Sequence, residues 1–588
     1  MVSRNFMAAA EVSIGVASPE AADEPRAIMA ESARTNGHAE DLFDYIIVGA
    51  GSAGCVLANR LSADPSIRVC LIEAGPPDRN PFIKVPLGVV HLLDHPKVNW
   101  RFASVPQKQA GGRVLPIPLG KTLGGTSSIN GMVYTRGHPH DYDDWAAAGC
   151  PGWSFREVLP YFTRSENNEN FPESAYHGKG GPTNVTNLDS YNPLCEALFQ
   201  AAESLGMKRC PDFCGPTHEG FTIRQSTVRG GMRESTARSY LKPARGRNNL
   251  TVLTQAQVTR LLFEERRAVG VEFVRDNARQ SVRARREIVL SAGTYGSSKL
   301  LMLSGVGDGE ELKRHGIPVV LSCPGVGRNL QEHVVAAIRY DSPTTVPYGL
   351  SLRTFPKVAW SFVEYLLFRR GLLANSIMHA GGFVKSDPSL DRPDIQLMLL
   401  PAYKNEKEKG RLRERLGFSH VAIGHGYGLI AMVMRPKSRG QVNLASNDYR
   451  AMPLIDPNFF ADERDLDLLV HGLKLARRVL EAPAFNPYRG KELVPGPDVQ
   501  GDEALKDFAR NFAVTGVHPV GTCRMGSDAN AVTDPELRVK GIEGLRVVDG
   551  SIMPTLIGGN TNGPIIMIAE KAADMILGKP PLPAETRI

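Results

Sequence analysis

The stretch 44–75 constrains the fold more than any other part of the chain. Residues 44–48, Asp-Tyr-Ile-Ile-Val, form a short apolar run rich in β-branched residues, which predicts a buried strand. The turn Gly-Ala-Gly-Ser-Ala-Gly follows at 49–54, and residues 55–61 continue with helical spacing. A second strand-like run, 69–73, ends in an acid. This order of strand, glycine turn, helix, strand and carboxylate is typical of a dinucleotide-binding unit.

Each part of this unit has a physical task in holding a dinucleotide. The first glycine permits a tight turn, the second lets backbone N–H groups approach a pyrophosphate, and the third lets the helix lie close to the sheet. The helix N-terminus supplies partial positive charge for the phosphates, and the final acid can accept hydrogen bonds from ribose hydroxyls. This stretch leaves open whether the dinucleotide is FAD or NAD. The predicted contacts are Gly49, Gly51, Ser52, Ala53, Gly54 and Glu73.

Composition describes a soluble globular protein, with 42% hydrophobic and 22% charged residues among 588. A net charge of +7, without any block of Lys and Arg, argues against nucleic-acid binding. The eight cysteines form no CxxC pair, which predicts free thiols in a reducing compartment and no metal site. We therefore expect a cytoplasmic protein, with membrane association as the alternative.

Two segments stand apart in composition. Residues 1–41 carry seven acids against three bases and lack the features of a secretory signal, which predicts a disordered tail. No window has the apolar length of a membrane span, and the closest, 358–373, is interrupted by Glu364, Arg369 and Arg370. A core helix is the favoured interpretation of 358–373, and a surface that touches a membrane is the alternative.

A second glycine-rich segment lies at 120–137. Its Gly, Ser and Thr residues, followed by Asn-Gly, suit backbone that lies against a flat ligand with many hydroxyl and N–H contacts. An ordinary flexible loop is disfavoured because apolar residues lie inside the run. The contacts predicted from this segment are Thr122, Gly125, Ser127, Asn130, Gly131, Met132 and Val133.

The strand 287–293 is expected to rejoin the sheet that 44–48 and 69–73 begin. The buried strand 287–293 leads into a helix at 297–303, and the strand 545–550 ends in an acid. A hairpin is expected at 258–273, strands at 396–400 and 429–434, and a helix from Asp462, as its N-cap, to Leu480. The run 558–564 opens an apolar helix, 564–577, whose positive end favours an anion such as a reduced flavin. The expected cofactor contacts in these parts are Val258, Asp549, Gly550, Thr561 and Asn562.

Four motifs occur in a characteristic order: 49–54, 120–137, the Ser-Ala-Gly strand with Leu-Ser-Gly-Val-Gly at 303–307, and the segment from His518 to Pro564. Together they resemble the glucose–methanol–choline (GMC) oxidoreductase family over Asp44 to Leu577. The resemblance implies an α/β protein that binds FAD, with a Rossmann-like FAD-binding domain made of separated segments. It also implies an α+β substrate domain with an antiparallel sheet. The expected division is a tail at 1–41, an FAD-binding domain at 42–150, 245–335 and 510–580, and a substrate-binding domain at 151–244 and 336–509.

The resemblance also implies the catalytic residues. By the family pattern, His518 is the base and Asn560 the second polar residue that faces the substrate carbon. Hydride transfer from an alcohol to flavin N5 requires a base with a pKa near neutrality, because the hydroxyl proton must leave as the hydride does. No metal is required. Some members attach FAD through a His at the position of Ile129, so we expect FAD to be bound non-covalently.

The substrate pocket is expected to contain Met378, His379 and Phe383. Many choline-dehydrogenase-like members have Glu at the position of His379, and a partly protonated His would repel a cation. We therefore expect neutral primary alcohols, oxidised to aldehydes, rather than choline.

Four alternatives are weighed against this interpretation. A choline dehydrogenase remains the first. Photodecarboxylases of the same fold carry Cys where Met378 falls and lack the His at 518, whereas hydroxynitrile lyases keep a comparable His. A non-catalytic flavin module would need neither His518 nor Asn560. The electron acceptor, a quinone, a dye or dioxygen, and the oligomeric state are left open.

Overall fold

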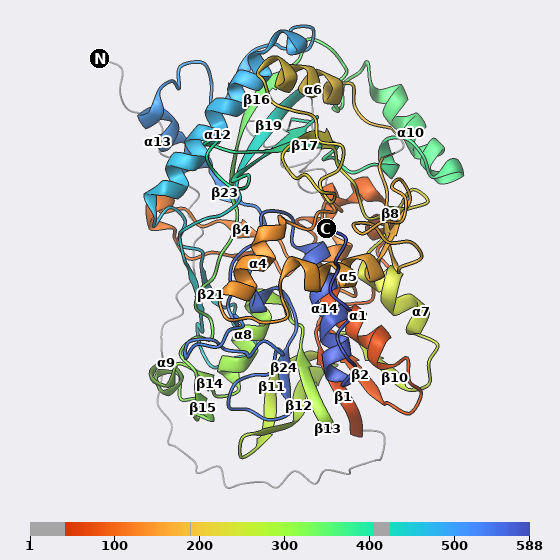
Figure 1. Cartoon of the computed structure of the whole chain (residues 1–588), viewed down its shortest axis with the longest axis vertical. Helices are drawn as coiled ribbons and strands as arrows, with labels where there is room; N and C mark the ends of the chain where they lie inside the picture. Colours follow the sequence, from red (N-terminus) through yellow and green to blue (C-terminus); the bar gives the residue numbers. More distant parts are fainter. Residues whose placement is uncertain (1–41, 189, 404–423) are drawn as a thin grey trace, which may run out of the picture. The chain divides into compact units, whose positions relative to one another are not determined.

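The computed structural model describes residues 42–188, 190–403 and 424–588. The predicted tail at 1–41 lies outside the described residues. The described chain belongs to one compact unit. Two seven-stranded sheets organise it, the first low and the second high in Figure 1.

The first sheet is parallel in its centre, with order β10-β2-β1-β13 and β24 beside β13. Ile46 of β1 lies between Cys70 and Ile288, and all three are fully buried. Continuous apolar strands of this kind are typical of a parallel sheet covered on both faces. An antiparallel hairpin, predicted at 258–273, extends the sheet as β11 and β12. The strands are β1 (Leu42–Val48), β2 (Val69–Ile72), β10 (Leu250–Leu253), β11 (Gln257–Glu264), β12 (Arg267–Arg275), β13 (Ala278–Leu290) and β24 (Leu545–Val547).

Helices α1 and α8 pack against strands of the first sheet. α1 (Ser52–Leu61) packs against α14 (Asn562–Ile576), and α14 packs against α5 (Phe155–Ser165). α8 (Gly293–Leu303) follows β13 directly and starts at Gly293 rather than at the expected Ser297. In the same way α14 starts at Asn562, two residues before the expected Pro564.

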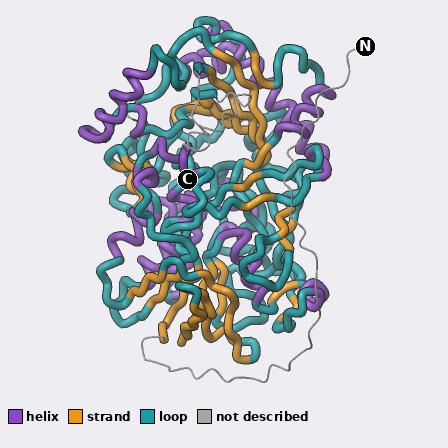
Figure 2. Tube along the Cα trace, turned by 180° about the vertical axis from the view of Figure 1, so that it is seen from behind, coloured by secondary structure: helices purple, strands orange, loops and turns teal. Residues whose placement is uncertain are grey.

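The second sheet is antiparallel, with order β22-β16-β19-β18-β17-β7 and β23 beside β16. The strands expected at 396–400 and 429–434 are present as β18 and β19. α12 (Glu463–Glu481) packs on this sheet, and the side chain of Asp462 caps it by accepting a hydrogen bond from Arg464 N, as predicted. Figure 2 shows the two groups of strands from behind. The strands are β7 (Gly220–Ile223), β16 (Val334–Asp341), β17 (Ala380–Val384), β18 (Ile395–Leu400), β19 (Gly426–Val433), β22 (Glu492–Val494) and β23 (Val514–Thr515).

Each sheet has its own hydrophobic core. The core of the first sheet also takes in Trp153 and Phe162, around α5, and Tyr240, which lie inside the segment expected to bind substrate. The boundaries given above for the two domains stay predictions.

The expectation of a core helix at 358–373 is wrong. The segment forms α10 (Phe355–Phe368), in which only Ser361 and Tyr365 are buried, and its large apolar side chains point to solvent. The apolar run predicted burial, but the face that contacts the protein is the one with the hydroxyl groups. Within the described ranges, no helix is both long and apolar enough to cross a membrane.

Candidate active site

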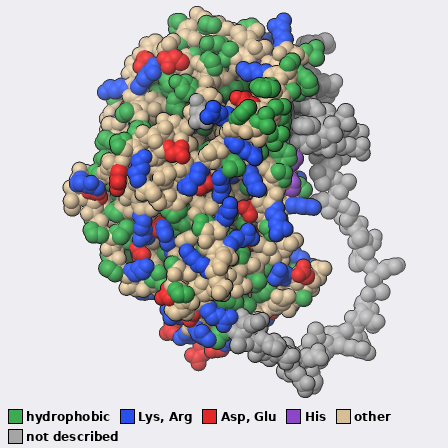
Figure 3. Space-filling model, turned by 90° about the vertical axis from the view of Figure 1, so that its right-hand side faces the viewer, with side chains coloured by type: hydrophobic (Ala, Val, Ile, Leu, Met, Phe, Trp, Pro, Cys, Tyr) green, Lys and Arg blue, Asp and Glu red, His purple; other side chains and the backbone are tan. Residues whose placement is uncertain are grey.

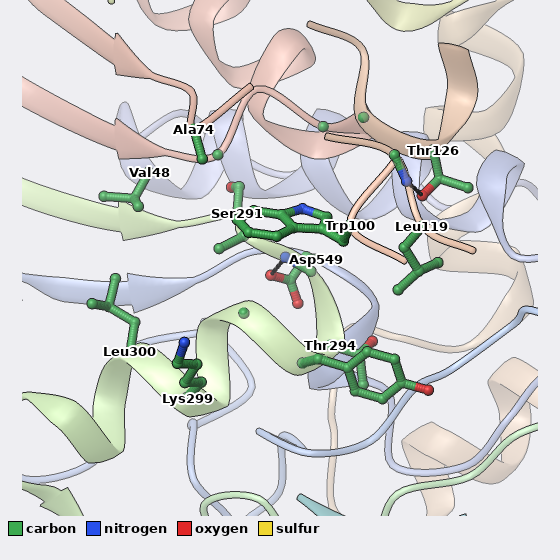
Figure 4. Close-up of a pocket in the computed structure, with 18 of the residues that line it drawn as sticks. Val48, Ala74, Trp100, Leu119, Thr126, Ser291, Thr294, Lys299, Leu300 and Asp549 are labelled. Atoms are coloured by element: carbon green, nitrogen blue, oxygen red, sulfur yellow. Dashed lines mark hydrogen bonds between the residues drawn. The ribbon is translucent and has the colours of Figure 1, made fainter. Parts of the chain in front are cut away.

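A cavity opens where the parallel strands end. Its walls come from the turn after β1, the end of β2, the turn between β13 and α8, and the segment after β24. Figure 4 shows Ser291, Thr294 and Trp100 among the lining residues, with Lys299 and Leu300 on α8. The carboxyl ends of parallel strands are where open α/β sheets bind ligands.

Ten of the eighteen predicted cofactor contacts meet at this cavity, although they come from positions as distant as 49 and 561. The backbone geometry of the turns explains why small residues are needed. Gly49 has φ of +99°, and a Cβ on Gly125 would lie 2.7 Å from Gly51 Cα. The ten residues are Gly49, Gly51, Ser52, Ala53, Glu73, Gly125, Val258, Asp549, Gly550 and Thr561.

The cavity fits the dinucleotide that the sequence predicts. No side chain caps the N-terminus of α1, so the N–H groups of its first turn are left for an anion such as a pyrophosphate. Glu73 accepts hydrogen bonds from the N–H groups of Ala50 and Gly75 and lies on the cavity wall. Burial raises the pKa of Glu73 to about 7. The uncapped N-terminus of α1 and the carboxylate of Glu73 are therefore suited to bind the phosphates and the ribose of FAD.

The other eight predicted contacts do not line this cavity, and several act on neighbours instead. A Cβ on Gly54 would lie 1.9 Å from Gly49 O, so Gly54 sets the contact between helix and turn. Asn562 accepts a hydrogen bond from Ser52 Oγ at 2.7 Å. Asn130 accepts from Met132 N and from Arg233, whose guanidinium also binds the carbonyl oxygens of the loop. The eight are Gly54, Thr122, Ser127, Asn130, Gly131, Met132, Val133 and Asn562.

Several lining residues were missed by sequence reasoning. Ser291 lies in the expected strand 287–293, directly after the end of β13, and at the same sheet edge as Gly49, so its position on that edge was a usable signal. Trp100 comes from a loop-rich region that carries no motif. Lys299 donates hydrogen bonds to the carbonyl oxygens of Tyr449 and Ala451, each at 2.6 Å, and burial lowers its pKa to about 8.

The structure brings His518 and Asn560 together. His518 Nε2 lies 2.9 Å from Asn560 Nδ2, and the backbone N–H of His518 donates to Glu332 Oε1 at 2.7 Å. Val517, on the cavity wall next to His518, has φ of +62°, a conformation that a β-branched residue rarely adopts. Val517 and Pro519, on either side of His518, line the cavity, as does Thr561, which follows Asn560, whereas His518 and Asn560 themselves are not among its lining residues.

The hydrogen bonds around His518 fix its tautomer. His333 Nε2 lies 3.1 Å from the carbonyl oxygen of Met434, which can only accept, so Nε2 carries the proton. Burial lowers the pKa of His333 to about 3, so this ring is neutral and its Nδ1 accepts. That atom is 2.9 Å from His518 Nδ1, which must therefore donate. The lone pair of neutral His518 is then on Nε2, next to Asn560.

Arg224 completes this arrangement. Its Nη2 donates to Asn560 Oδ1 at 2.9 Å, which orients the amide so that Nδ2 faces His518. The guanidinium is buried, and within the described chain its Nε and Nη1 have no hydrogen-bond partner. Burial lowers its pKa to about 9, which still leaves it charged at neutral pH. Burial first, and then the neighbouring His333 ring and the positive charge of Arg224, hold the pKa of His518 well below 6.5.

The residues expected in the substrate pocket divide into two kinds. Phe383 belongs to an apolar cluster with Met432 and Met434, and Met378 packs against this cluster. The cluster lies next to His333, because the carbonyl oxygen of Met434 is 3.1 Å from His333 Nε2. His379 is fully buried, its Nδ1 accepts from the backbone N–H of Asn192, and burial lowers its pKa to about 4. The expected partial protonation of His379 is therefore wrong, because a buried neutral ring cannot repel a cation.

The fold and the site define a dinucleotide-binding α/β protein with a hydrogen-bonded His–Asn pair next to residues of the cavity wall. Residues 43–335 and 436–569 match the N- and C-terminal parts of the GMC oxidoreductase family. The chain belongs to the GMC oxidoreductases, which confirms the predicted family, fold class and enzyme class.

Curated relatives and solved structures agree with this assignment. The chain is 44% identical over 540 residues to an alcohol dehydrogenase [acceptor] of Pseudomonas putida, covering 92% of this chain and 96% of that protein. It is 41% identical over 541 residues to an oxygen-dependent choline dehydrogenase of Brucella canis, with the same coverage. The crystal structure of pyridoxine 4-oxidase from Mesorbium loti matches with a TM-score of 0.82 and 31% identity, over 92% of this chain and 100% of that one. The structure of a formate oxidase variant from Aspergillus oryzae, which addresses the effect of a substitution on FAD modification, matches with a TM-score of 0.83 and 26% identity, over 92% of this chain and 98% of that one.

Proposed function

We propose that the protein oxidises a neutral primary alcohol to the aldehyde, with non-covalent FAD and with His518 as the base. The observation that carries the proposal is the hydrogen-bonded pair of His518 and Asn560, 2.9 Å apart, whose chain neighbours Val517, Pro519 and Thr561 line the dinucleotide cavity. The pair explains proton removal and substrate orientation at one point. Binding of the cofactor alone requires neither.

The residues divide the work in a definite way. FAD, when bound, supplies the acceptor for the hydride. His518 Nε2 carries the lone pair and takes the proton of the alcohol hydroxyl, because His333 holds the other ring nitrogen as a donor. Asn560 Nδ2 lies close enough to donate to the same oxygen and so to orient the carbon that reacts. Arg224, fixed on Asn560, stabilises negative charge that develops on that oxygen.

Arg224 also supports the choice of a neutral substrate over choline. A buried guanidinium without an acidic partner in the described chain leaves positive charge beside the catalytic pair. A quaternary ammonium group would have to be buried near that charge. The apolar cluster of Phe383, Met432 and Met434 suits an aliphatic or aromatic body instead.

Flavin reduction in His518→Ala tests the assignment of the base. The variant should keep its FAD, while reduction by alcohol, followed by stopped-flow absorbance, slows by about two to four orders of magnitude. Asn560→Ala should have a smaller effect, because it orients the substrate without taking the proton. Reduction of His518→Ala at the unmodified rate would refute the role.

A matched pair of substrates tests the substrate class. Choline and 3,3-dimethyl-1-butanol have the same shape but differ by one positive charge. The unmodified enzyme should prefer the carbon analogue in kcat/KM by about tenfold or more, and Arg224→Met should narrow that preference. A preference for choline in the unmodified enzyme would instead favour a choline dehydrogenase, the activity named for the relative from Brucella canis.

A further inference from the structure

Helix α10 is amphipathic, but its polar face contacts the protein and its apolar face points to solvent. The positions that face the protein are Thr354, Ser361 and Tyr365, and the outward positions are apolar. Eight of the sixteen exposed large apolar side chains within the described residues lie between Leu352 and Phe368. Seven of them have exposed fractions between 41% and 69%: Phe355, Trp360, Phe362, Val363, Leu366, Leu367 and Phe368. A contiguous apolar surface of this kind marks an interaction site.

The charges around this surface are almost all positive. Arg353, Lys357, Arg369 and Arg370 are exposed at the two ends of α10, and none of them forms an ion pair with a described acid. Glu364 is the one acid between Leu352 and Arg370 in the sequence. Figure 3, which views the side of the molecule where α10 lies, shows apolar side chains in its upper part with Lys and Arg among them.

The helix is held to the body of the protein by its polar face. Tyr365 donates a hydrogen bond to the carbonyl oxygen of Lys84, and Ser361 Oγ bonds within the helix to Lys357 O. The guanidinium of Arg369 lies 4.9 Å from the ring of Tyr365. The apolar side chains are therefore presented outward by a fixed helix, and turning them inward would expose the contacts of Tyr365.

We propose that α10 docks the protein on an anionic lipid surface, with its apolar face in the acyl boundary and its bases on the headgroups. A helix with large aromatic and aliphatic residues on one side and bases around them lies in the plane of a bilayer interface and does not span it. The positive flanks match anionic headgroups. The same charges oppose pairing of two copies through α10, because each copy would present its bases to the other.

Trp360 gives a direct test with the full-length holoenzyme. Trp145 and Trp153 are fully buried and Trp100 lines the dinucleotide cavity, so Trp360 is the tryptophan that lipid can reach. Vesicles of phosphatidylglycerol with brominated phosphatidylcholine should quench tryptophan fluorescence, and Trp360→Phe should lose most of that quenching while still binding. Unquenched fluorescence with vesicles present would overturn the proposal.

Co-sedimentation with vesicles tests the two contributions separately. Leu366→Gln with Leu367→Gln should lower the bound fraction by about tenfold or more. Lys357→Glu with Arg370→Glu should weaken binding to mixed vesicles of phosphatidylglycerol and phosphatidylcholine, as should added salt, with little change on phosphatidylcholine alone.

The matched control is Phe512→Gln with Val514→Gln, two exposed apolar residues on other elements, which should bind like the unmodified protein. Flavin content and circular dichroism should be the same in every variant, because all these side chains are exposed.

Two results would contradict membrane docking. Equal loss of binding in the Phe512 control would mean that the vesicles bind exposed apolar residues in general and not α10 in particular. A dimer in sedimentation velocity that disappears in the Leu366 and Leu367 variant, together with no vesicle binding, would assign the surface to a second copy of the chain.

Discussion

His333 Nδ1 lies 2.9 Å from His518 Nδ1, and the opposite nitrogen of His333 lies 3.1 Å from the carbonyl oxygen of Met434. The backbone carbonyl of Met434, directly after β19, therefore determines which nitrogen of His518 bears a proton. The backbone cannot titrate, so the free lone pair on His518 Nε2 is set by the fold. This makes His333 a positioning residue, since it acts on the substrate only through His518.

Replacement of His333 should slow the proton-transfer step. His333→Phe leaves His518 Nδ1 without its acceptor, so the imidazole spends time in the other tautomer, with no lone pair on Nε2. We expect flavin reduction by alcohol to slow by about tenfold to a hundredfold, with little change in the alcohol concentration for half-saturation. His425→Phe, which removes a histidine bonded to Ser351 and Pro347 away from the site, is the control and should react at the normal rate. A change confined to half-saturation would mean that His333 shapes the pocket instead.

The rate of flavin reduction by alcohol should not fall as the pH is lowered through 6.5. The neutral form of His518 is the base, and burial, the neighbouring His333 and the charge of Arg224 lower its pKa well below 6.5. Because the protonated, inactive form appears only below the folded-state pKa, kcat/KM should stay level as the pH falls through 6.5 and decline only at lower pH. An acid limb centred at 6.5 would contradict the arrangement.

Arg224→Met should move this acid limb to higher pH. Removal of a neighbouring positive charge stabilises protonated His518, so its pKa rises toward 6.5. Arg224→Lys, which keeps the charge but loses the fork that holds Asn560, is the matched variant and should leave the limb near its original pH. The measurement is the pH profile of kcat/KM, which is independent of how far either variant lowers the maximal rate.

Two glycines of the first turn should respond differently to alanine. A Cβ on Gly51 meets only Ser291 O at 3.8 Å, whereas a Cβ on Gly54 would lie 1.9 Å from Gly49 O. Gly51→Ala should therefore fold but bind FAD poorly, because the methyl group occupies the path of the pyrophosphate. Gly54→Ala should lose stability as well. Flavin-to-protein ratio and thermal unfolding separate the two outcomes, and a fully yellow Gly51→Ala protein would show that the pyrophosphate lies elsewhere.

The purified protein should release all its flavin on acid precipitation. Ile129 is buried among Ile83, Leu92 and Val98 and offers no nucleophile for a covalent bond. Yellow supernatant and colourless pellet are the expected result. Flavin that stays with the pellet would require attachment through another residue.

The sequence predicted what local patterns encode. The turn at Gly49, the cap at Asp462 and the strand before Asp549 each depend on neighbours within a few residues, so their positions agree with the structure. Arg224 was missed because nothing near it in sequence marks it; it reaches Asn560 across 336 residues. His379 was misjudged because its charge depends on burial, which the sequence around it does not give. α10 was misjudged because an apolar run predicts a buried surface without saying which partner covers it.

The hydrogen bond from Ser52 to Asn562 joins residues 510 positions apart. A ribosome adds about 5–20 residues per second, so roughly 25–100 s pass between synthesis of the glycine turn and synthesis of Asn562. A nascent chain that has made β1, α1 and β2 holds half of a nucleotide site and no β24 or α14 to close it. FAD therefore binds after synthesis of the chain is complete. The yield of active enzyme in a cell then depends on how long the flavin-free protein stays folded before FAD binds.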